Sequence, residues 1–443
     1  MWRYTNSCQW SVDSGQRKKK MKAAEIIAIG SELLTPERSD TNSLWFTEKL
    51  NEIGVEVKLK TIVGDDEARL EETIRDAMKR SDIVITTGGL GPTEDDVTRP
   101  VAARAIGREL VYHTEIEEHL RERFRGWGRE MPEINKRQAY AIEGSEILPN
   151  PNGSAAGMFV EVDGKVLAIF PGPPRENQPM FTDHVLPKLR KLSGGVLVRK
   201  RVLRVTGMGE SAIDEAIAPI YREYRDVRTS ILFSKSEVEV HLSATSTDEN
   251  KALATLEELT NKISGKLGIA VFATNGETME QVIGKLLAGR GETVSTAESC
   301  TGGLIARRLT ELAGSSKFFM EGAVTYSNEA KMRTLGVRRE TLDNFGAVSS
   351  ETAEEMALGM RARSGTDYAI SVTGIAGPDG GSEEKPVGTV WFGLADSEGV
   401  KTIKFVFPGD RYLIRWRSSQ AGLDILRRRL LKRADTKTTK TSV

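Results

Sequence analysis

Short apolar segments alternate with amphipathic segments along most of this chain. The segments AEIIAIG (24–30) and DIVITTGG (82–89) are apolar and rich in β-branched residues, which is typical of buried parallel strands. Between them, NSLWFTEKLNEIG (42–54) and DEARLEETIRDAMKR (66–80) carry apolar residues at helical spacing. The order predicts a βαβ series, and hence an α/β layer fold, that continues to VLAIFPGPP (166–174).

A different pattern follows a break at RKLSGGV (190–196). It predicts strands, a short helix from Glu210 and a long helix from Asp248, and it ends near ATNGET (273–278). A second α/β series then runs to a final arginine-rich helix, which is expected from Asp410 to about Lys432.

The predicted fold class is therefore α/β. Two three-layer α/β domains, at 22–190 and 275–433, are joined by a small α+β domain at 191–274. The polar segments 1–21 and 434–443 are expected to be a disordered extension and a disordered tail. Either Met1 or Met21 is compatible with the start of the chain.

Composition excludes several classes of protein. Among the 443 residues, 63 Lys and Arg balance 63 Asp and Glu, so binding of nucleic acid as the main task is not expected. No apolar run approaches the roughly 20 residues that span a bilayer, so no membrane contact is expected. The two cysteines, Cys8 and Cys300, make neither a disulfide framework nor a zinc site, which favours a cytoplasmic location.

The positions of the four histidines limit the chemistry of the last domain. They are His113, His119, His184 and His241, so none lies in the second α/β series. A catalytic nucleophile there cannot use a histidine of its own domain. Its base must be lysine, tyrosine or a carboxylate.

The segment AESCTGG (297–303) offers two candidate nucleophiles, Ser299 and Cys300. It follows a predicted strand and precedes a helix, which is where ligands bind in open α/β sheets. Gly302 and Gly303 would let an anion or an oxyanion approach the backbone N–H groups. The alternative is a structural turn, with a helix cap and glycines for close packing.

Two more predicted strand ends carry polar side chains. GAVTYSNEAK (322–331) places Tyr326 at a strand terminus and Lys331 just inside a helix, and SVTGIAGPDGG (371–381) ends a strand at Thr373. Together with Ser299 they make a plausible site. Each also fits a purely structural role: a half-buried tyrosine, a solvated lysine and a glycine-rich turn.

In the first domain, GGLGPTEDDVT (88–98) suggests a glycine loop that approaches a diphosphate, with Asp95 and Asp96 near a hard cation. The alternative is that Thr93 and Asp96 form a capping box, because they have its spacing. Glu176 in PPREN is a further candidate. The candidate residues of the loop itself are Gly88, Gly89, Gly91, Thr93, Asp95 and Asp96.

Several motifs resemble those of the competence/damage-inducible protein CinA family. AESCTGG, GAVTYSNEAK, GAVSSETAEEMA and SVTGIAGPDGG…KPVGTV match its carboxyl-terminal domain over about 277–432. IGSELL, TGGLGPTEDDVTR, NKRQA, LPNPNGSAAG and FPGPPREN resemble its amino-terminal domain, which is akin to the molybdopterin-binding MoaB/MogA fold. GMGES matches its KH-like connector. FPGPPREN and LLTPERSDTN depart slightly from the family pattern.

This resemblance implies that the last domain is a nicotinamide mononucleotide deamidase that needs no cofactor. Ser299 would be the nucleophile, Lys331 the base and Tyr326 a proton relay. Cys300 is the rival nucleophile, but we expect it to be structural, because its domain has no histidine to activate it and cysteine buries well as a small apolar group. Arg411 or Arg415 would hold the substrate phosphate. The remaining residues assigned to catalysis or substrate binding are Thr301, Gly302, Gly303, Thr373, Gly374 and Gly377.

For the first domain, the resemblance implies hydrolysis of ADP-ribose with a divalent cation, Mg²⁺ in the first instance, held by Asp95 and Asp96. The alternative is an accessory protein, linked to competence or the response to DNA damage, that binds molybdopterin or a nucleotide without hydrolysing it. A homodimer is expected.

Overall fold

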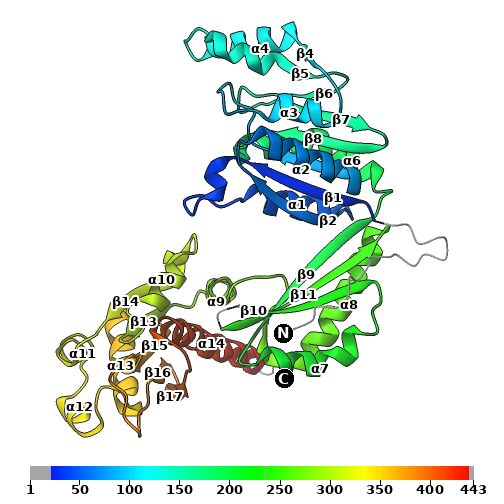
Figure 1. The fold of residues 1–443 in the computed structure, drawn as a ribbon. Coiled ribbons are helices and arrows are strands. Elements are labelled where there is room, and N and C mark those ends of the chain that lie inside the picture. The colour runs from blue at the N-terminus through cyan, green and yellow to red at the C-terminus, as the bar shows by residue number, and fades with distance from the viewer. Residues whose placement is uncertain (1–20, 235, 439–443) are drawn as a thin grey trace. The chain divides into compact units, whose positions relative to one another are not determined.

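The computed structural model describes residues 21–234 and 236–438, and side chains in the last helix up to residue 432. Residues 1–20 of the extension predicted at 1–21, and residues 439–443, lie outside this part. Contacts divide the chain into two compact units, one of residues up to 199 with 244–255, the other of residues 200–243 with the chain from 256 onward. Figure 1 shows the elements as a ribbon.

The first unit is built on a six-stranded sheet with the order β2-β1-β3-β8-β7-β6. The strands β2, β1, β3 and β8 are parallel, and β7 and β6 are antiparallel to their neighbours. The strands are β1 (Ala23–Ile29), β2 (Glu56–Val63), β3 (Ile83–Thr87), β6 (Glu146–Leu148), β7 (Gly157–Val162) and β8 (Lys165–Phe170). The helices are α1 (Asn42–Glu52), α2 (Glu67–Arg80), α3 (Thr98–Ala105), α4 (Thr114–Gly126), α5 (Pro174–Met180) and α6 (Leu186–Leu192).

Alternation along β1 divides the core of the first unit into two layers. Ile27 and Ile29 pack into one cluster with α2 and α3, whereas Ala24 and Ile26 pack into another with α1, α5 and α6. Successive side chains of a strand point to opposite faces, so both faces of the sheet are covered by helices. The predicted three-layer α/β arrangement is confirmed.

A small two-stranded sheet was not predicted. It pairs β4 (Leu110–Tyr112) with β5 (Tyr140–Ile142), beside α4 (Figure 1). Its strands are only three residues long. A strand that short has no periodicity that can be read from the sequence.

The α+β segment forms a four-stranded sheet with the order β10-β11-β9-β12 and two helices. The helices α7 and α8 begin at Glu210 and Glu249, at or next to the expected positions. The division between the two units falls within β9, β11 and α8. The elements are β9 (Leu197–Thr206), α7 (Glu210–Tyr221), β10 (Val227–Ser234), β11 (Glu237–Ser246), α8 (Glu249–Leu267) and β12 (Val271–Ala273).

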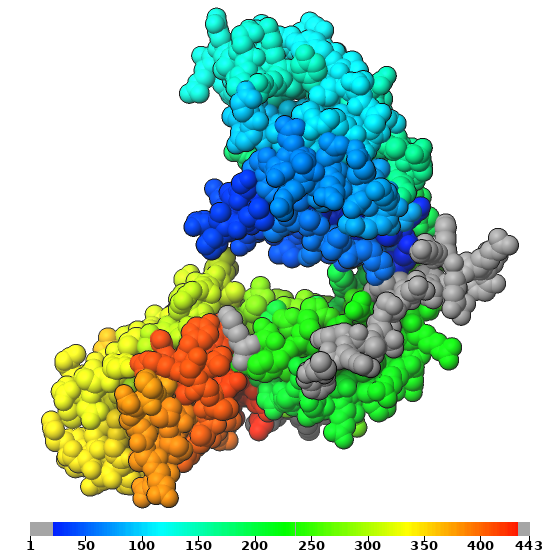
Figure 2. All heavy atoms as spheres, in the orientation of Figure 1, coloured from blue at the N-terminus to red at the C-terminus, as the bar shows by residue number. Residues whose placement is uncertain are grey.

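The last part of the chain forms a five-stranded sheet with the order β14-β13-β15-β16-β17. The strands are β13 (Val294–Glu298), β14 (Phe319–Val324), β15 (Tyr368–Gly374), β16 (Thr389–Asp396) and β17 (Gly399–Val406). The helices are α9 (Met279–Ala288), α10 (Leu304–Thr310), α11 (Asn328–Leu335), α12 (Arg339–Phe345), α13 (Ser350–Ser364) and α14 (Arg411–Thr438). In Figure 2 the orange segment around β16 and β17 forms part of the surface of the second unit.

Helices also cover both faces of this sheet. One core cluster joins it to α9, α10 and α14, and the other joins it to α11, α12 and α13. The strands β13, β14 and β15 are parallel, so their carboxyl ends share one edge. The last helix runs to Thr438, through the first residues of the segment expected as a disordered tail. In the described part of the chain, no helix combines the length and the hydrophobicity that crossing a membrane requires.

Candidate active site

Ser299 directly follows β13, the middle one of the three parallel strands. Its backbone N–H donates to the Val372 carbonyl of β15 at 2.9 Å, and its carbonyl accepts from the Gly302 N–H at 3.0 Å. Gly302 and Gly303 have φ angles of 60° and 88°, the left-handed region that favours glycine. The glycine pair is thus required by the tight turn that leads from β13 into α10.

Lys331 reaches Ser299 from the neighbouring strand-to-helix segment. Ser327 caps α11 by accepting from the Ala330 N–H, which places Lys331 one turn into the helix. The Lys331 Nζ lies 3.1 Å from the Ser299 Oγ, although the residues are 32 positions apart. The sequence pattern predicted that the two strand ends are adjacent, and here their side chains are in contact.

The surroundings of Lys331 favour a neutral amine. The side chain is 1% exposed, and burial lowers its pKa below the ordinary lysine value. Its Nζ donates to the backbone carbonyl of Thr325 at 2.9 Å and is 3.4 Å from that of Tyr326. A neutral amine has two N–H groups for these carbonyls, and its lone pair is then available to the Ser299 hydroxyl.

Cys300 is buried within the apolar core. It packs among the residues shared by the sheet and α9, α10 and α14, and burial raises its pKa to about 12. A thiolate is the reactive form of cysteine, so this thiol is unreactive near neutral pH.

Glu298 is a component of the site that was not predicted from the sequence. It is the last residue of β13, it is 1% exposed, and its carboxylate accepts from the backbone N–H groups of Ile305 and Ala306 at 3.1 and 2.8 Å. These amides at the start of α10 were expected to be free for an anion or an oxyanion. The carboxylate of the chain itself binds them instead, and only the position of a glutamate before the serine could have suggested this.

Tyr326, Arg411 and Gly377 form a second group at this edge of the sheet. The Tyr326 ring is 60% exposed, and its hydroxyl accepts from the Arg411 Nη2 at 2.9 Å. The other terminal nitrogen of Arg411 donates to the Gly377 carbonyl at 2.7 Å. The Tyr326 side chain is therefore bonded to an arginine, and only its backbone carbonyl approaches Lys331.

Three further predicted residues, Thr373, Gly374 and Arg415, make contacts within the protein. Thr373 is 1% exposed, and its hydroxyl donates to the Ala347 carbonyl at 2.6 Å. A Cβ at Gly374 would come within 2.8 Å of the Thr389 carbonyl, so packing alone requires glycine there. Arg415 donates to the Thr301 carbonyl at 2.8 Å, so it braces the turn that carries Ser299.

The first unit contains a separate cavity of about 390 Å³ at the carboxyl ends of β3 and β8. Of the residues predicted for this domain, the cavity brings together Gly88, Gly89, Gly91, Asp95, Asp96 and Glu176. Thr93 does not line it. Its hydroxyl and backbone N–H donate to the Asp96 carboxylate at 2.5 and 2.9 Å.

The glycines of this loop are required by contacts within the protein. A Cβ at Gly88 would lie 2.1 Å from the Ile29 carbonyl, and one at Gly89 would lie 2.3 Å from the Thr98 hydroxyl oxygen. Their φ angles of 113° and 63° also favour glycine. The glycines thus allow the loop to pack against β1 and α3.

Asp95 and Asp96 differ in their surroundings. Asp96 accepts from the Gly91 N–H at 2.7 Å and from Thr93, so both of its oxygens hold the loop together. Because α3 begins only at Thr98, these bonds close a turn before the helix and do not form a capping box. Asp95 is exposed, and the Thr93 hydroxyl donates to Asp96 instead.

The lining of this cavity is acidic. Among the described residues it includes five carboxylates and no lysine or arginine, and two of the acids, Glu32 and Asp65, were not predicted from the sequence. Glu176 is buried and accepts from the Asn150 amide at 2.7 Å. Within the described ranges, no three His, Cys, Asp or Glu side chains gather closely enough to hold a metal ion by themselves. A cation here would need ligands from a substrate as well, which is how Mg²⁺ commonly binds at phosphates.

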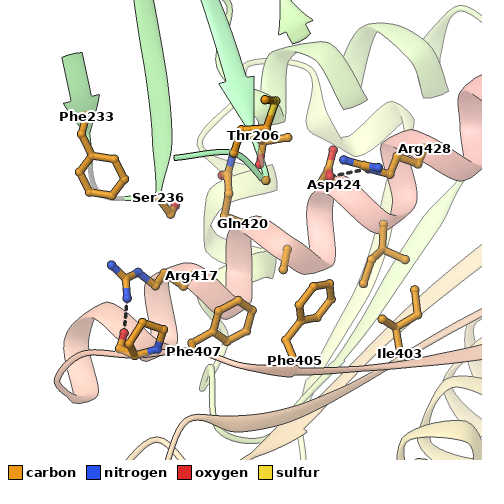
Figure 3. Close-up of a pocket in the computed structure, with 15 residues that line it drawn as sticks. Thr206, Phe233, Ser236, Ile403, Phe405, Phe407, Arg417, Gln420, Asp424 and Arg428 are labelled. Carbon is orange, nitrogen blue, oxygen red and sulfur yellow. Dashed lines mark hydrogen bonds and ion pairs between the residues drawn. The ribbon is translucent and has the colours of Figure 1, made fainter. Parts of the chain in front are cut away.

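A further cavity, of about 560 Å³, lies within the second unit and contains none of the predicted site residues. Figure 3 shows the rings of Phe405 and Phe407 along one side and Gln420 and Asp424 of α14 beside them. The two rings are stacked, with centroids 5.4 Å apart.

Comparison with known proteins assigns each part of the chain to a family model. Residues 25–191 match the "Probable molybdopterin binding domain", residues 200–273 the "Damage-inducible protein CinA KH domain" and residues 276–430 the "CinA C-terminal domain". These matches follow the three segments that differ in their sequence pattern.

Relatives resemble the chain over most of its length. A CinA-like protein of Solibacter usitatus is 47% identical over 413 residues, which cover 93% of this chain and 99% of that protein. A CinA-like protein of Koribacter versatilis is 45% identical and covers 92% and 100%. A crystal structure of a competence/damage inducible protein from Agrobacterium tumefaciens is 47% identical with a TM-score of 0.33, and it covers 33% of this chain and 91% of that one. The chain belongs to the CinA family.

Proposed function

We propose that the second unit deamidates nicotinamide mononucleotide to nicotinate mononucleotide and ammonia. The observation that carries this proposal is the contact between the buried Lys331 amine and the Ser299 hydroxyl, at 3.1 Å. Hydrolysis of a primary carboxamide is acyl transfer, which a serine can perform when an adjacent neutral base takes its proton. The lowered pKa of Lys331 supports that role.

In the first half-reaction, the neutral Lys331 amine removes the proton of Ser299 while the Oγ bonds to the carboxamide carbon. The carbonyl electron pair moves onto oxygen to form a tetrahedral intermediate. When it collapses, the C–N bond breaks, and the Lys331 ammonium returns the proton to the leaving nitrogen. Ammonia departs, and an ester on Ser299 remains.

In the second half-reaction, Lys331 takes a proton from water as the water oxygen adds to the ester carbon. The bond to the Ser299 Oγ then breaks, and the serine regains its proton from Lys331. The amides of Ser299, Gly302, Ile305 and Ala306 are already bonded within the protein, so any donor to the oxyanion is a different group.

Arg411 and Arg415 are the candidates for binding the substrate phosphate, and we favour Arg411. It is exposed, and its partners are the neutral Tyr326 hydroxyl and a backbone carbonyl, so its charge is available to an anion. Tyr326 then acts in substrate binding, because its hydroxyl is bonded to Arg411 and not to Lys331. Thr373 supports the site through its bond to Ala347.

The test is to incubate the purified chain with nicotinamide mononucleotide and to measure ammonia and nicotinate mononucleotide in equal amounts. No metal or organic cofactor should be required, so activity should survive treatment with a chelator. Absence of ammonia release from a folded preparation would overturn the proposal.

For the first unit, we propose hydrolysis of nucleoside diphosphate sugars, with ADP-ribose as the first compound to test. The supporting observation is the acidic cavity, which has no basic side chain among the described residues that line it. A diphosphate is repelled by such a surface unless a divalent cation lies between them. Exposed Asp95 is the carboxylate most available to Mg²⁺, because Asp96 is bonded to the loop.

The second candidate for this cavity is binding of molybdopterin or a nucleotide without hydrolysis, as the family model for residues 25–191 suggests. Release of AMP from ADP-ribose with Mg²⁺ separates the two, since a binding protein would retain the ligand intact.

A homodimer is also part of our proposal. β17 is an edge strand of its sheet, with Val406 53% exposed, and an exposed edge favours pairing with a second copy of the chain.

A further inference from the structure

Glu298 is a buried carboxylate beside the nucleophile that has no part in the proton transfers described above. It is 1% exposed, and no lysine or arginine forms an ion pair with it in the described part of the chain. Its oxygens accept instead from two backbone amides, those of Ile305 and Ala306. A buried charge is costly unless such hydrogen bonds satisfy it, so its retention here calls for a reason.

These bonds fix the path of the chain on both sides of Ser299. The side chain of residue 298 is tied to residues 305 and 306, so the intervening turn, which begins with Ser299, is closed into a loop. Within that loop the Gly302 N–H donates to the Ser299 carbonyl at 3.0 Å. Two glycines with positive φ make the turn flexible by itself, and the carboxylate holds it together with the bond from Arg415 to the Thr301 carbonyl.

The same residue also holds the partner of the nucleophile. The Glu298 carbonyl accepts from the Thr325 N–H at 2.8 Å, and the Thr325 carbonyl in turn accepts from the Lys331 Nζ at 2.9 Å. The backbone of Glu298 therefore sets the acceptor that orients the lysine, and its side chain sets the turn that carries the serine. Both ends of the 3.1 Å contact between Lys331 and Ser299 depend on it.

We propose that Glu298 is the positioning residue of this site. Its carboxylate holds the Ser299 turn at the distance from Lys331 that proton transfer needs, without touching the substrate. The inference rests on the proposed deamidase function. Misplacement of a reacting group by about 1 Å can cost on the order of 10²-fold in rate, so loss of the carboxylate should lower kcat strongly.

The substitution Glu298→Ala tests this by chemical rescue. Alanine keeps the Cβ and removes the next methylene and the carboxyl group, which together have the size of acetate. We expect kcat for ammonia release to fall about 10²-fold with little change in KM, and added acetate to restore much of it in a saturable manner. Formate should rescue less well, and benzoate, which is too large for the space, should not rescue at all.

Two controls separate positioning by the carboxylate from a general effect of acetate on the enzyme. Ser299→Ala should not respond to acetate, because the nucleophile itself is missing. Glu298→Gln fills the space and keeps one acceptor oxygen, but its NH₂ group faces a backbone N–H. It should lose kcat and gain nothing from acetate. Acetate should also raise the melting temperature of Glu298→Ala, but not that of Glu298→Gln.

Full kcat in either Glu298 variant would overturn the proposal, as would a folded and inactive Glu298→Ala that acetate does not restore. If Glu298→Ala does not fold, the kcat of Glu298→Gln decides. If the wild-type chain releases no ammonia, the proposed function fails on its own. The effect of acetate on melting then still tests where the carboxylate binds.

Discussion

Burial has opposite chemical consequences for Lys331 and Cys300, although it favours the neutral form of both. A neutral lysine is a base, so the lowered pKa of Lys331 suits the role that we propose for it, which is to take the proton of Ser299. A neutral thiol is a poor nucleophile, so a pKa of about 12 keeps Cys300 inert. Burial of both side chains therefore supports the proposed serine and lysine over the neighbouring cysteine.

The pH dependence of deamidation should follow Lys331. Its pKa in the folded protein lies below the ordinary lysine value of 10.5, and the active form is the unprotonated one. The rate should therefore rise with pH through this lowered pKa, and the midpoint of the rise should lie below 10.5. The measurement is kcat/KM against pH for the wild-type chain and for Lys331→Met.

In Lys331→Met the remaining activity should be at least about a thousandfold lower, and the ionisation should vanish from the profile. A profile that keeps the same ionisation in this variant would assign it to another group. The free energy of unfolding should change with pH in the same direction as the rate, so it should rise as pH rises. Between the folded and unfolded pKa values the unfolded chain binds more protons, so the contribution of Lys331 to stability is lost as pH falls through the folded pKa.

Some of the residues at the candidate site were predicted from the sequence, and others were not. The strand ends with Ser299, Tyr326 and Thr373 followed from the pattern, and the catalytic roles came from family resemblance. The bond from Arg411 to the Tyr326 hydroxyl joins residues 85 positions apart, and no local rule predicts it. Glu298 was missed because a glutamate at the end of a strand is ordinarily expected to face solvent.

At the scale of the elements, the loop from β3 to α3 contains residues that stabilise its own structure and one residue that is available to a ligand. Gly88 and Gly89 permit close packing against β1 and α3, and Asp96 ties the loop to itself. Asp95 is left exposed at the cavity. Two adjacent aspartates that look equivalent in the sequence therefore have different surroundings.

Substituting each aspartate by asparagine should separate these roles. Asp96→Asn removes an acceptor for the Gly91 or Thr93 N–H and should lower the free energy of unfolding of the first unit by about 1–3 kcal/mol. Asp95→Asn should leave that free energy unchanged but abolish Mg²⁺-dependent AMP release from ADP-ribose. Both should spare deamidation. Thermal unfolding and AMP assays check this, and full AMP release by Asp95→Asn would remove it from the cation site.

Helices and strands whose apolar residues recur with a clear period were predicted from the sequence, and elements without such a period were not. The strands β1 and β3 and the helices α1 and α2 followed from their apolar patterns, and so did the start of α7. The short pair β4 and β5 depends on contacts between residues distant in sequence, which a pattern does not contain. The end of α14 was placed too early, because the sequence after Lys432 has no apolar period to indicate a helix.

At the scale of the whole molecule, we predict that the last domain folds and acts without the rest of the chain. The two core clusters of the last sheet lie almost entirely within residues 279–430, so a fragment from Asn275 onward should fold and deamidate nicotinamide mononucleotide. It loses the bonds from Arg427 to the Ile269 carbonyl, at 2.6 Å, and from Gln420 to Glu237, at 3.2 Å. Its stability should therefore fall by about 1–3 kcal/mol.

Ammonia release and thermal unfolding of the fragment, beside the full chain, check this prediction. A folded fragment without activity would mean that the site needs residues from elsewhere in the chain or from a second copy. The sequence predicted the three segments, because each has its own pattern. It could not predict that the α+β segment and the last domain contact each other through Glu237 and α14.

The central claim is that Ser299 attacks and Cys300 does not, and a paired substitution tests it most directly. Ammonia release from nicotinamide mononucleotide is measured for Ser299→Ala and Cys300→Ala, with circular dichroism to verify that both variants fold. We expect Ser299→Ala to lose at least about a thousandfold in kcat/KM and Cys300→Ala to keep most of it. An active Ser299→Ala beside an inactive, folded Cys300→Ala would contradict the account.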